Sequence, residues 1–278
     1  MSDPAETPTR PPIGSKDIRD LGRQLVVAEK SAQPIPPLSD LYEISVGNAY
    51  AIQKRYAELR VEAGATVVGH KIGCTSQAIQ NLFNIDTPDY GHLFDDMLVG
   101  ESDPIEVDDL IQPLTEPEMA FVLAETLSGP GVTAEDVVAA SRGVVPCLEI
   151  IDSRIRDWKI RLADTIADNG SSARFVVGTE VVPINGLDLA AEQVLLTRNG
   201  KEVGRGLGSA ALGHPARSAA WLANALGEFG ESIPAGSYVL SGSLTTAIPA
   251  RTRDRFRAEF SNIGVVSCWF SGDQKEGD

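Results

Sequence analysis

Three glutamates in the middle of the chain have the residue type and spacing of ligands for one metal ion. Glu116 and Glu118 are two residues apart in QPLTEPEMAFVLAE, and Glu149 is in VVPCLEII. Side chains two apart on an extended segment point to the same face, so Glu116 and Glu118 can reach one point. Glu149 ends an apolar run, where a carboxylate is costly unless it is neutralised or finds a cation.

The chemistry of these ligands indicates which ion they suit. Carboxylate oxygens without a nearby His or Cys cluster favour Mg²⁺, Mn²⁺ or Ca²⁺ over Zn²⁺. Three protein ligands would leave open coordination positions, where a substrate could chelate. A structural explanation stays open: the Glu-Pro-Glu segment could be a solvated start of a strand, because Pro117 confines it to a strand start or a sheet edge. Glu149 could equally form an ion pair with an arginine.

Lys71 is a candidate for binding a carboxylate or for acid–base chemistry. It stands between Gly69, His70 and Gly73 at the end of a predicted strand, where small residues allow a ligand to come close. A lysine in such a place can bind a carboxylate, or act as an acid or base when its pKa is lowered. The alternative is an ordinary surface lysine in a loop.

Other polar residues are weaker candidates for a functional site. Asp89 in TPDYG is typical of a turn, and residues 168–172 (DNGSS) are typical of a polar loop. Residues 241–243 (SGS) resemble a tight turn whose backbone N–H groups could meet an anion. The three histidines show no ligand spacing and are expected to be structural. They are His70, His92 and His214.

Two helices are expected before these residues. Apolar residues recur at helical spacing over residues 15–30, and a second helix is expected up to about Ala63, with Gly64 as its stop. The first fourteen residues are rich in proline and polar side chains, which predicts a disordered tail. We therefore expect a tail over residues 1–14, a helical segment over residues 15–64 and the main domain over residues 65–278.

Short β-type runs punctuated by Gly, Pro and Asp follow Gly64. Asn199-Gly200 predicts a hairpin turn, and one long helix is expected over residues 215–229. Strands are predicted in ATVVGHKIG, GHLFDDMLV, MAFVLAE, residues 143–151, EVVPI, QVLLTRNGKEVGRG, SYVLSGS, DRFRAEFS and GVVSCWF. Strands mixed irregularly with a few helices predict a β-rich α+β domain, because the elements do not alternate as βαβ units would.

Composition and charge restrict the classes of partner. The formal charge of −15 argues against nucleic acid or an anionic membrane as a partner. It would also repel an anionic substrate, which a local cation or lysine must then attract. The cysteines, Cys74, Cys147 and Cys268, are odd in number and far apart, a reduced intracellular pattern. With no signal-peptide-like start and no apolar run long enough to span a bilayer, we expect a cytoplasmic protein.

Five ordered motifs together carry a family resemblance. They are GHKIGCTSQAIQNLFNIDTPDYGHLFDDM, QPLTEPEMAFVL, CLEIIDSRIRDWKIRLADTIADNGSSARFVVG, LGHPARSAAWLANALGEFG and YVLSGSLTTAIP. Over about residues 40 to 270 the chain resembles the 2-hydroxypenta-2,4-dienoate (2-keto-4-pentenoate) hydratases of aromatic meta-cleavage pathways, and the related 4-oxalocrotonate decarboxylases. Both groups belong to the fumarylacetoacetate hydrolase superfamily.

The resemblance implies a fold and a site. The fold is a β-rich mixed barrel or roll of the fumarylacetoacetate hydrolase type, with an N-terminal helical segment before the catalytic domain. The implied ligands of Mg²⁺ or Mn²⁺ are Glu116, Glu118 and Glu149, and the resemblance also places Lys71 and Asp89 in the active site. It further implies a homo-oligomer that can associate with other pathway enzymes. No organic cofactor is expected, and no dinucleotide or phosphate-loop motif is present.

The implied reaction adds water to 2-hydroxypenta-2,4-dienoate, or a close analogue, and gives a 4-hydroxy-2-oxo acid. The substrate's carboxylate and 2-oxygen would bind at the cation, where developing negative charge is stabilised. Lys71 would transfer a proton or stabilise the 2-oxygen, and Asp89 would orient the lysine or the water.

Two alternatives to the hydratase reaction stay open. The same site could carry out a decarboxylation of the 4-oxalocrotonate type or an acylpyruvate-type C–C hydrolysis, because EPEMAF and SSARFVVG resemble the decarboxylases equally. A decarboxylase substrate has a second carboxylate, but the sequence does not place Arg154, Arg174 or Arg251 relative to the metal. A catalytically silent partner subunit is the other alternative, and the retained lysine and glutamates count against it.

Overall fold

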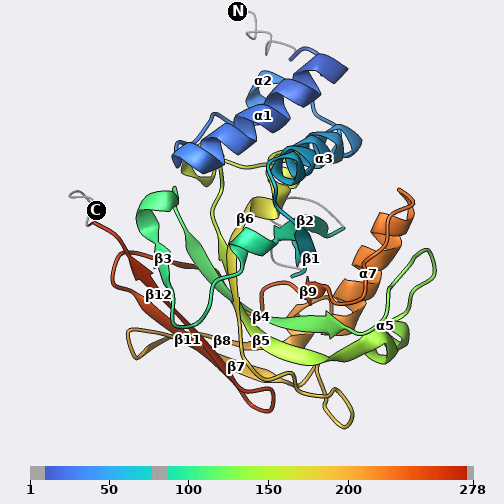
Figure 1. Cartoon of the computed structure of the whole chain (residues 1–278), viewed down its shortest axis with the longest axis vertical. Coiled ribbons are helices and arrows are strands. Elements are labelled where there is room, and N and C mark those ends of the chain that lie inside the picture. The colour runs from blue at the N-terminus through green and yellow to red at the C-terminus, as the bar shows by residue number, and fades with distance from the viewer. Residues whose placement is uncertain (1–9, 77–79, 81–86, 274–278) are drawn as a thin grey trace, which may run out of the picture.

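A seven-stranded sheet carries the candidate residues. The computed structural model describes residues 10–76, 80 and 87–273, and the strand order of this sheet is β2-β1-β9-β4-β5-β6, with β10 joined to β4 (Figure 1). Neighbouring strands are antiparallel except for the parallel pair β1 and β9. Its strands are β1 Val67–Gly73, β2 Asp89–Phe94, β4 Leu114–Leu123, β5 Ser141–Ile151, β6 Ser172–Val177, β9 Tyr238–Leu240 and β10 Ile248–Pro249.

A five-stranded sheet of order β3-β12-β11-β7-β8 packs beside it. The predicted hairpin turn is confirmed, since Asn199 and Gly200 join β7 to β8 with φ of 53° and 77°. Positive φ at both turn residues is what a tight hairpin of this twist requires. The strands are β3 Pro104–Glu106, β7 Gln193–Arg198, β8 Lys201–Leu207, β11 Arg255–Phe260 and β12 Val265–Ser271.

The N-terminal helices lie together at one end of the molecule, at the top of Figure 1. The two long helices predicted in this segment are confirmed as α1 and α3. Among the described residues, none of the helices combines the length and the apolar character of a membrane span. The helices are α1 Ser15–Ser31, α2 Leu38–Leu41, α3 Val46–Glu62, α5 Ala134–Ala140, α6 Leu162–Ala167 and α7 Pro215–Gly227. Short 3₁₀ turns are η1 Asp95–Met97, η2 Val107–Asp109, η3 Arg156–Trp158, η4 Asn169–Ser171 and η5 Gly208–Ala210.

Two apolar cores lie on opposite faces of the larger sheet. One joins the two sheets to α5 and α7, and it contains Phe121, Leu148 and Phe256. The other joins the larger sheet to α1, α3 and α6, and it contains Ile52 and Phe175. Alternation along β4 and β5 explains this division, because successive side chains of a strand point to opposite faces. The helical segment therefore shares a core with the sheet that carries the candidate site.

The predicted β-rich α+β architecture is confirmed, with two local corrections. The run EVVPI is not a strand, and only Val182 forms an isolated bridge, to Val144. Pro183 explains the break, because a proline has no N–H to continue a ladder. Of the predicted tail, residues 1–9 lie outside the described residues, while the carbonyl of Pro11 accepts a hydrogen bond from the backbone N–H of Glu43.

Pro117 lies inside β4 at a local edge of the sheet, which is the second of the two positions, strand start or sheet edge, that the sequence allowed. β4 pairs with β5 along its whole length, but on its other side it pairs with β10 at Leu114–Thr115 and with β9 only from Ala120 onward. Pro117 falls in the gap between these two pairings. Its carbonyl accepts the N–H of Leu244 at 3.0 Å, so the loop after β9 fills the gap. A proline, which has no N–H, is tolerated there because no neighbouring strand needs a backbone donor at this position.

A buried ion pair organises the connection between β5 and β6. Arg154 Nε lies 2.6 Å from Asp168 Oδ1, and both side chains are buried. The guanidinium also donates to the backbone carbonyls of Asp152 and Ser172, at 2.9 and 2.8 Å. Burial raises the pKa of Asp168 to about 6, although Arg154 and hydrogen-bond donors around the carboxylate oppose that rise. The connection is thus held by one arginine.

Replacing Arg154 tests this arrangement. We expect Arg154→Met to lower the free energy of unfolding at pH 7.5 by about 3–5 kcal/mol, because it leaves a buried carboxylate without its cation. Below pH 6 the loss should shrink, since Asp168 can then take up a proton and become neutral. Urea unfolding at the two pH values measures both effects. The control is Arg205→Met, which removes an exposed pair with Glu202 and should change stability little; equal losses in the two variants would contradict the assignment.

Candidate metal and active site

The register of β4 and β5 brings the three predicted glutamates together. Glu116 lies directly across from Glu149, and Glu118 lies two residues further along the same face of β4. One ligand oxygen from each can be chosen so that all lie within 4.8 Å of one another. Glu118 and Glu149 are fully buried, whereas Glu116 is partly exposed. Within residues 10–76, 80 and 87–273, this is the one such group of His, Cys, Asp or Glu side chains.

The carboxylate oxygens of this cluster are short of hydrogen-bond donors. Glu118 Oε2 accepts the N–H of Gly242 at 2.8 Å, but Glu118 Oε1 and both oxygens of Glu149 have no hydrogen-bond partner. Burial, then the charge of Glu149, raises the pKa of Glu118 well above its ordinary value. Burial also raises the pKa of Glu116 to about 7, although Lys71 opposes the rise. Buried oxygens of this kind, from carboxylates alone, fit a hard divalent cation.

Lys71 is buried beside this cluster, not exposed in a loop. Its Nζ lies 3.4 Å from Glu149 Oε2, and among the described residues no other basic side chain forms an ion pair with any of the three glutamates. Burial disfavours the charge of Lys71, but the carboxylates of Glu149, Asp89 and the other two glutamates outweigh burial and raise its pKa. Within the protein alone, Lys71 is therefore held as a cation.

Asp89 lies against Gly73, on the same side as the amine of Lys71. Asp89 is the first residue of β2, not part of a surface turn, and it pairs with Gly73 across the strands. A β-carbon at Gly73 would lie 2.1 Å from Asp89 Oδ1 and 3.3 Å from Lys71 Nζ, so only glycine leaves room for both groups. The hydroxyl of Thr165 donates to Asp89 Oδ2 at 3.2 Å. Burial raises the pKa of Asp89, while Lys71 and Thr165 lower it.

One backbone N–H and one hydroxyl group donate hydrogen bonds to carboxylates of the site. The predicted anion-binding turn at residues 241–243 does face an anion, and that anion is the carboxylate of Glu118. Thr165 had no sequence signal, because it lies on α6, 76 residues from Asp89, among ordinary helix-forming residues. The distance in sequence explains the omission, since only the fold brings α6 to β2.

Other candidates from the sequence have structural roles. The guanidinium of Arg154 is occupied by Asp168 and two carbonyls, as described above. His70 and His92 face each other across β1 and β2, with ring centroids 5.0 Å apart, and burial lowers the pKa of each. His214 caps α7, where its Nδ1 accepts the N–H of Ala216 at 3.1 Å.

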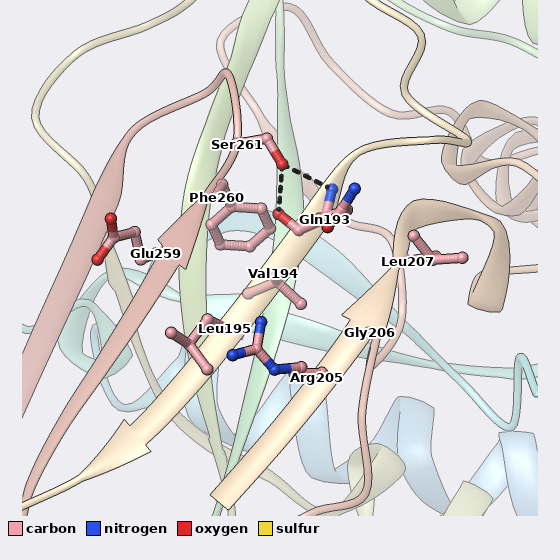
Figure 2. Close-up of a pocket in the computed structure, with 9 residues that line it drawn as sticks. All are labelled: Gln193, Val194, Leu195, Arg205, Gly206, Leu207, Glu259, Phe260 and Ser261. Carbon is pink, nitrogen blue, oxygen red and sulfur yellow. Dashed lines mark hydrogen bonds between the residues drawn. The ribbon is translucent and has the colours of Figure 1, made fainter. Parts of the chain in front are cut away.

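A surface cavity of about 450 Å³ lies on the five-stranded sheet, away from the cluster (Figure 2). It lies along β7, β8 and β11, and the hydroxyl of Ser261 binds the backbone of Gln193 at its rim. None of the five candidate site residues lines it. This cavity therefore does not mark the candidate site.

Comparison with known sequences identifies close relatives, although no family model matches the chain. A 2-hydroxyhexa-2,4-dienoate hydratase of Comamonas testosteroni is 45% identical over 257 residues, which cover 91% of this chain and 97% of the relative. A 2-hydroxypent-2,4-dienoate hydratase of Pseudomonas putida is 46% identical over 77% of this chain and 97% of its own length. A 2-keto-4-pentenoate hydratase of Paraburkholderia xenovorans is 39% identical over 93% of this chain and 96% of its own length.

Comparison with solved structures gives the same superfamily. The 4-oxalocrotonate decarboxylase of Pseudomonas putida G7, complexed with magnesium and adipate, superposes with a TM-score of 0.90 at 34% identity, over 94% of this chain and 100% of that one. The fumarylpyruvate hydrolase of Pseudomonas aeruginosa, in complex with Mn²⁺ and pyruvate, covers 73% of this chain and 89% of its own; its TM-score of 0.59 at 13% identity shows a shared fold. The family resemblance of the motifs is confirmed. The chain belongs to the 2-hydroxypenta-2,4-dienoate (2-keto-4-pentenoate) hydratase family, a family of hydro-lyases in the fumarylacetoacetate hydrolase superfamily.

Proposed function

We propose that this protein hydrates 2-hydroxypenta-2,4-dienoate, or a close analogue, to a 4-hydroxy-2-oxo acid in aromatic catabolism. The observation that carries the proposal is a buried carboxylate cluster in contact with a lysine on a hydratase-family fold. We assign Glu116, Glu118 and Glu149 as ligands of a divalent cation, Mg²⁺ or Mn²⁺. The oxygens of Glu118 and Glu149 that accept no hydrogen bond support this assignment, because the one ion pair with Lys71 leaves most of the buried negative charge uncompensated.

The cation's contribution is electrostatic. When bound, it would act as a Lewis acid for the carboxylate and 2-oxygen of the substrate. The metal-bound relatives agree with a hard ion at such a site, since the decarboxylase is complexed with magnesium or calcium and the hydrolase with Mn²⁺. The three glutamates would hold the cation and would leave part of its surface free for the carboxylate and 2-oxygen of the substrate.

The side chains of Lys71 and Asp89 fit the proton transfers. Hydration requires the dienol to lose its O2 proton and gain one at C5, after which a water hydroxyl adds to C4 and its proton goes to C3. Lys71 is cationic within the protein alone, which suits donation of a hydrogen bond or a proton to the 2-oxygen. A cation bound by the glutamates would offset their charge and lower the pKa of Lys71 toward its ordinary value. Asp89, at Gly73 beside Lys71, would orient that amine or the water.

Decarboxylation on the same site is the second candidate, and the structural match to 4-oxalocrotonate decarboxylase favours it. Its substrate has two carboxylates, so the distal one needs a cationic partner. Arg154 does not supply that partner, since its N–H groups bind Asp168 and two carbonyls. Arg154 is therefore excluded from the three arginines considered for this role.

We also infer a cytoplasmic homo-oligomer that can associate with other pathway enzymes. Three free cysteines, two of them buried, are typical of a reducing compartment. The oligomer is inferred from the family alone, and light scattering on the purified protein measures it.

A paired assay tests the reaction. With Mg²⁺ or Mn²⁺ present, we expect loss of 2-hydroxypenta-2,4-dienoate absorbance with formation of 4-hydroxy-2-oxopentanoate, and no carbon dioxide from 4-oxalocrotonate. Glu149→Gln should lower kcat/KM by at least about a hundredfold, because one ligand charge is lost. Glu192→Gln is the matched control: Glu192 is also buried, but it binds Asn262 outside the site. Carbon dioxide release from 4-oxalocrotonate alone would move the protein to the decarboxylases.

Metal binding should stabilise the fold and depend on pH. At a cation concentration of 100 times Kd, we expect about 2.7 kcal/mol of added stability, which Glu118→Gln should largely abolish. The raised pKa of Glu116, about 7, means that a proton competes with the cation below pH 7. The apparent affinity should therefore be weaker at pH 6 than at pH 8, with more proton release at pH 6. Titration calorimetry measures both, and equal affinity at the two pH values would contradict the assignment of Glu116.

A further inference from the structure

One segment covers both proposed catalytic residues. This cover segment, residues 162–171, comprises α6 and η4. From α6, the hydroxyl of Thr165 donates to Asp89. From η4, Gly170 lies over Lys71, since a β-carbon there would be 3.1 Å from Lys71 Cδ. The position of this segment on β2 therefore determines the surroundings of both side chains.

Gln53 joins the cover segment to β2 from the N-terminal helix α3. Its side chain is buried, and its Nε2 donates to the carbonyl of Tyr90 at 2.8 Å and to that of Ile166 at 2.7 Å. These two residues directly follow Asp89 on β2 and Thr165 on α6. Both N–H groups of one amide are thus used to hold together the two backbones that carry the Asp89–Thr165 hydrogen bond.

Asn169 makes a second link between the same two elements. Its Oδ1 accepts the N–H of His92 at 2.7 Å, and its Nδ2 donates to the carbonyl of His92 at 2.9 Å. The side-chain amide therefore replaces a neighbouring strand at this point of β2. Its own carbonyl packs on Gly91, where a β-carbon would come within 2.2 Å. Asn169 has φ of 56°, a conformation that asparagine tolerates better than most residues.

We propose that Gln53 and Asn169 are positioning residues for Lys71 and Asp89. Their two carboxamides set the register of the cover segment on β2, which places Thr165 on Asp89 and Gly170 against Lys71. The two hydrogen bonds of Gln53 are buried and the two of Asn169 are partly buried, so the loss of any one leaves a polar group unpaired in or near the interior and shifts the segment. The stack of Tyr50 on Tyr90, with centroids 4.7 Å apart, adds a second contact between α3 and β2. The assignment rests on the proposed roles of Lys71 and Asp89.

Removing the amide of Gln53 tests the proposal. Gln53→Met keeps the length of the side chain but cannot donate, and we expect kcat to fall ten- to a hundredfold, roughly the effect of a small misplacement. KM should change less than about threefold and Mg²⁺ affinity should stay the same, because the metal ligands are on β4 and β5. Thr165→Val should lower kcat in the same way. The double variant should be no worse than the more damaged single variant, since both act on one contact.

Tyr56→Phe on the same helix is the matched control. Tyr56 is buried, and its hydroxyl donates to Glu29 Oε2 at 2.8 Å, away from the cover segment. This variant should lose stability while kcat stays unchanged. Loss of stability without loss of kcat in Gln53→Met, or additive losses in the double variant, would overturn the proposal.

Asn169→Asp gives a readout that needs no turnover. The substitution keeps the acceptor for the N–H of His92 but removes the donor to its carbonyl. Hydrogen exchange should quicken in residues 162–171 and in β2, with β4 and β5 unchanged. If the wild-type protein does not convert the dienoate, the proposed function has failed. The hydrogen-exchange measurement still tests whether Asn169 holds the cover segment on β2. Unchanged exchange in residues 162–171 would overturn the role of Asn169.

Discussion

The gathering of three carboxylates, two of them fully buried, around one lysine is the constraint on which this structure depends. Glu116, Glu118 and Glu149 point to one place, and among the described basic residues only Lys71 forms an ion pair there, with Glu149. Burial raises the pKa of Glu116 and Glu118, and repulsion from Glu149 adds to the rise. Such an arrangement is retained only when something of positive charge completes it, because a buried, unpaired charge opposes folding.

The surrounding fold leaves space for this cluster instead of filling it. Along β4 the strand pairing is interrupted on one side, and Pro117 stands in the interruption. The loop after β9 enters there and brings the N–H of Gly242 to Glu118. On the far side, Gly73 leaves the space in which Lys71 and Asp89 meet. Close packing elsewhere keeps these positions fixed, since the sheet is covered by an apolar core on each face.

The sequence predicted the parts of this site that depend on local spacing. A two-residue interval on a strand was enough for Glu116 and Glu118, and an apolar run singled out Glu149. Lys71 was recognisable from its neighbouring glycines. Gln53 and Thr165 could not be recognised in the sequence. Their partners Ile166 and Asp89 lie 113 and 76 residues away, and common helix residues carry no sign of such contacts. The failed strand at EVVPI has a local cause, since Pro183 has no N–H with which to extend the bridge between Val182 and Val144.

Charge also couples the metal to the substrate in the proposed reaction. The whole chain carries a formal charge of −15, and the cluster adds three carboxylates where an anionic dienoate must bind. Lys71 is already paired with Glu149, so it cannot by itself reverse the sign of the site. An anion entering before the cation would meet net negative charge at short range, where screening by salt is weak. Cation binding must therefore precede or accompany substrate binding, and the affinity for each depends on the presence of the other.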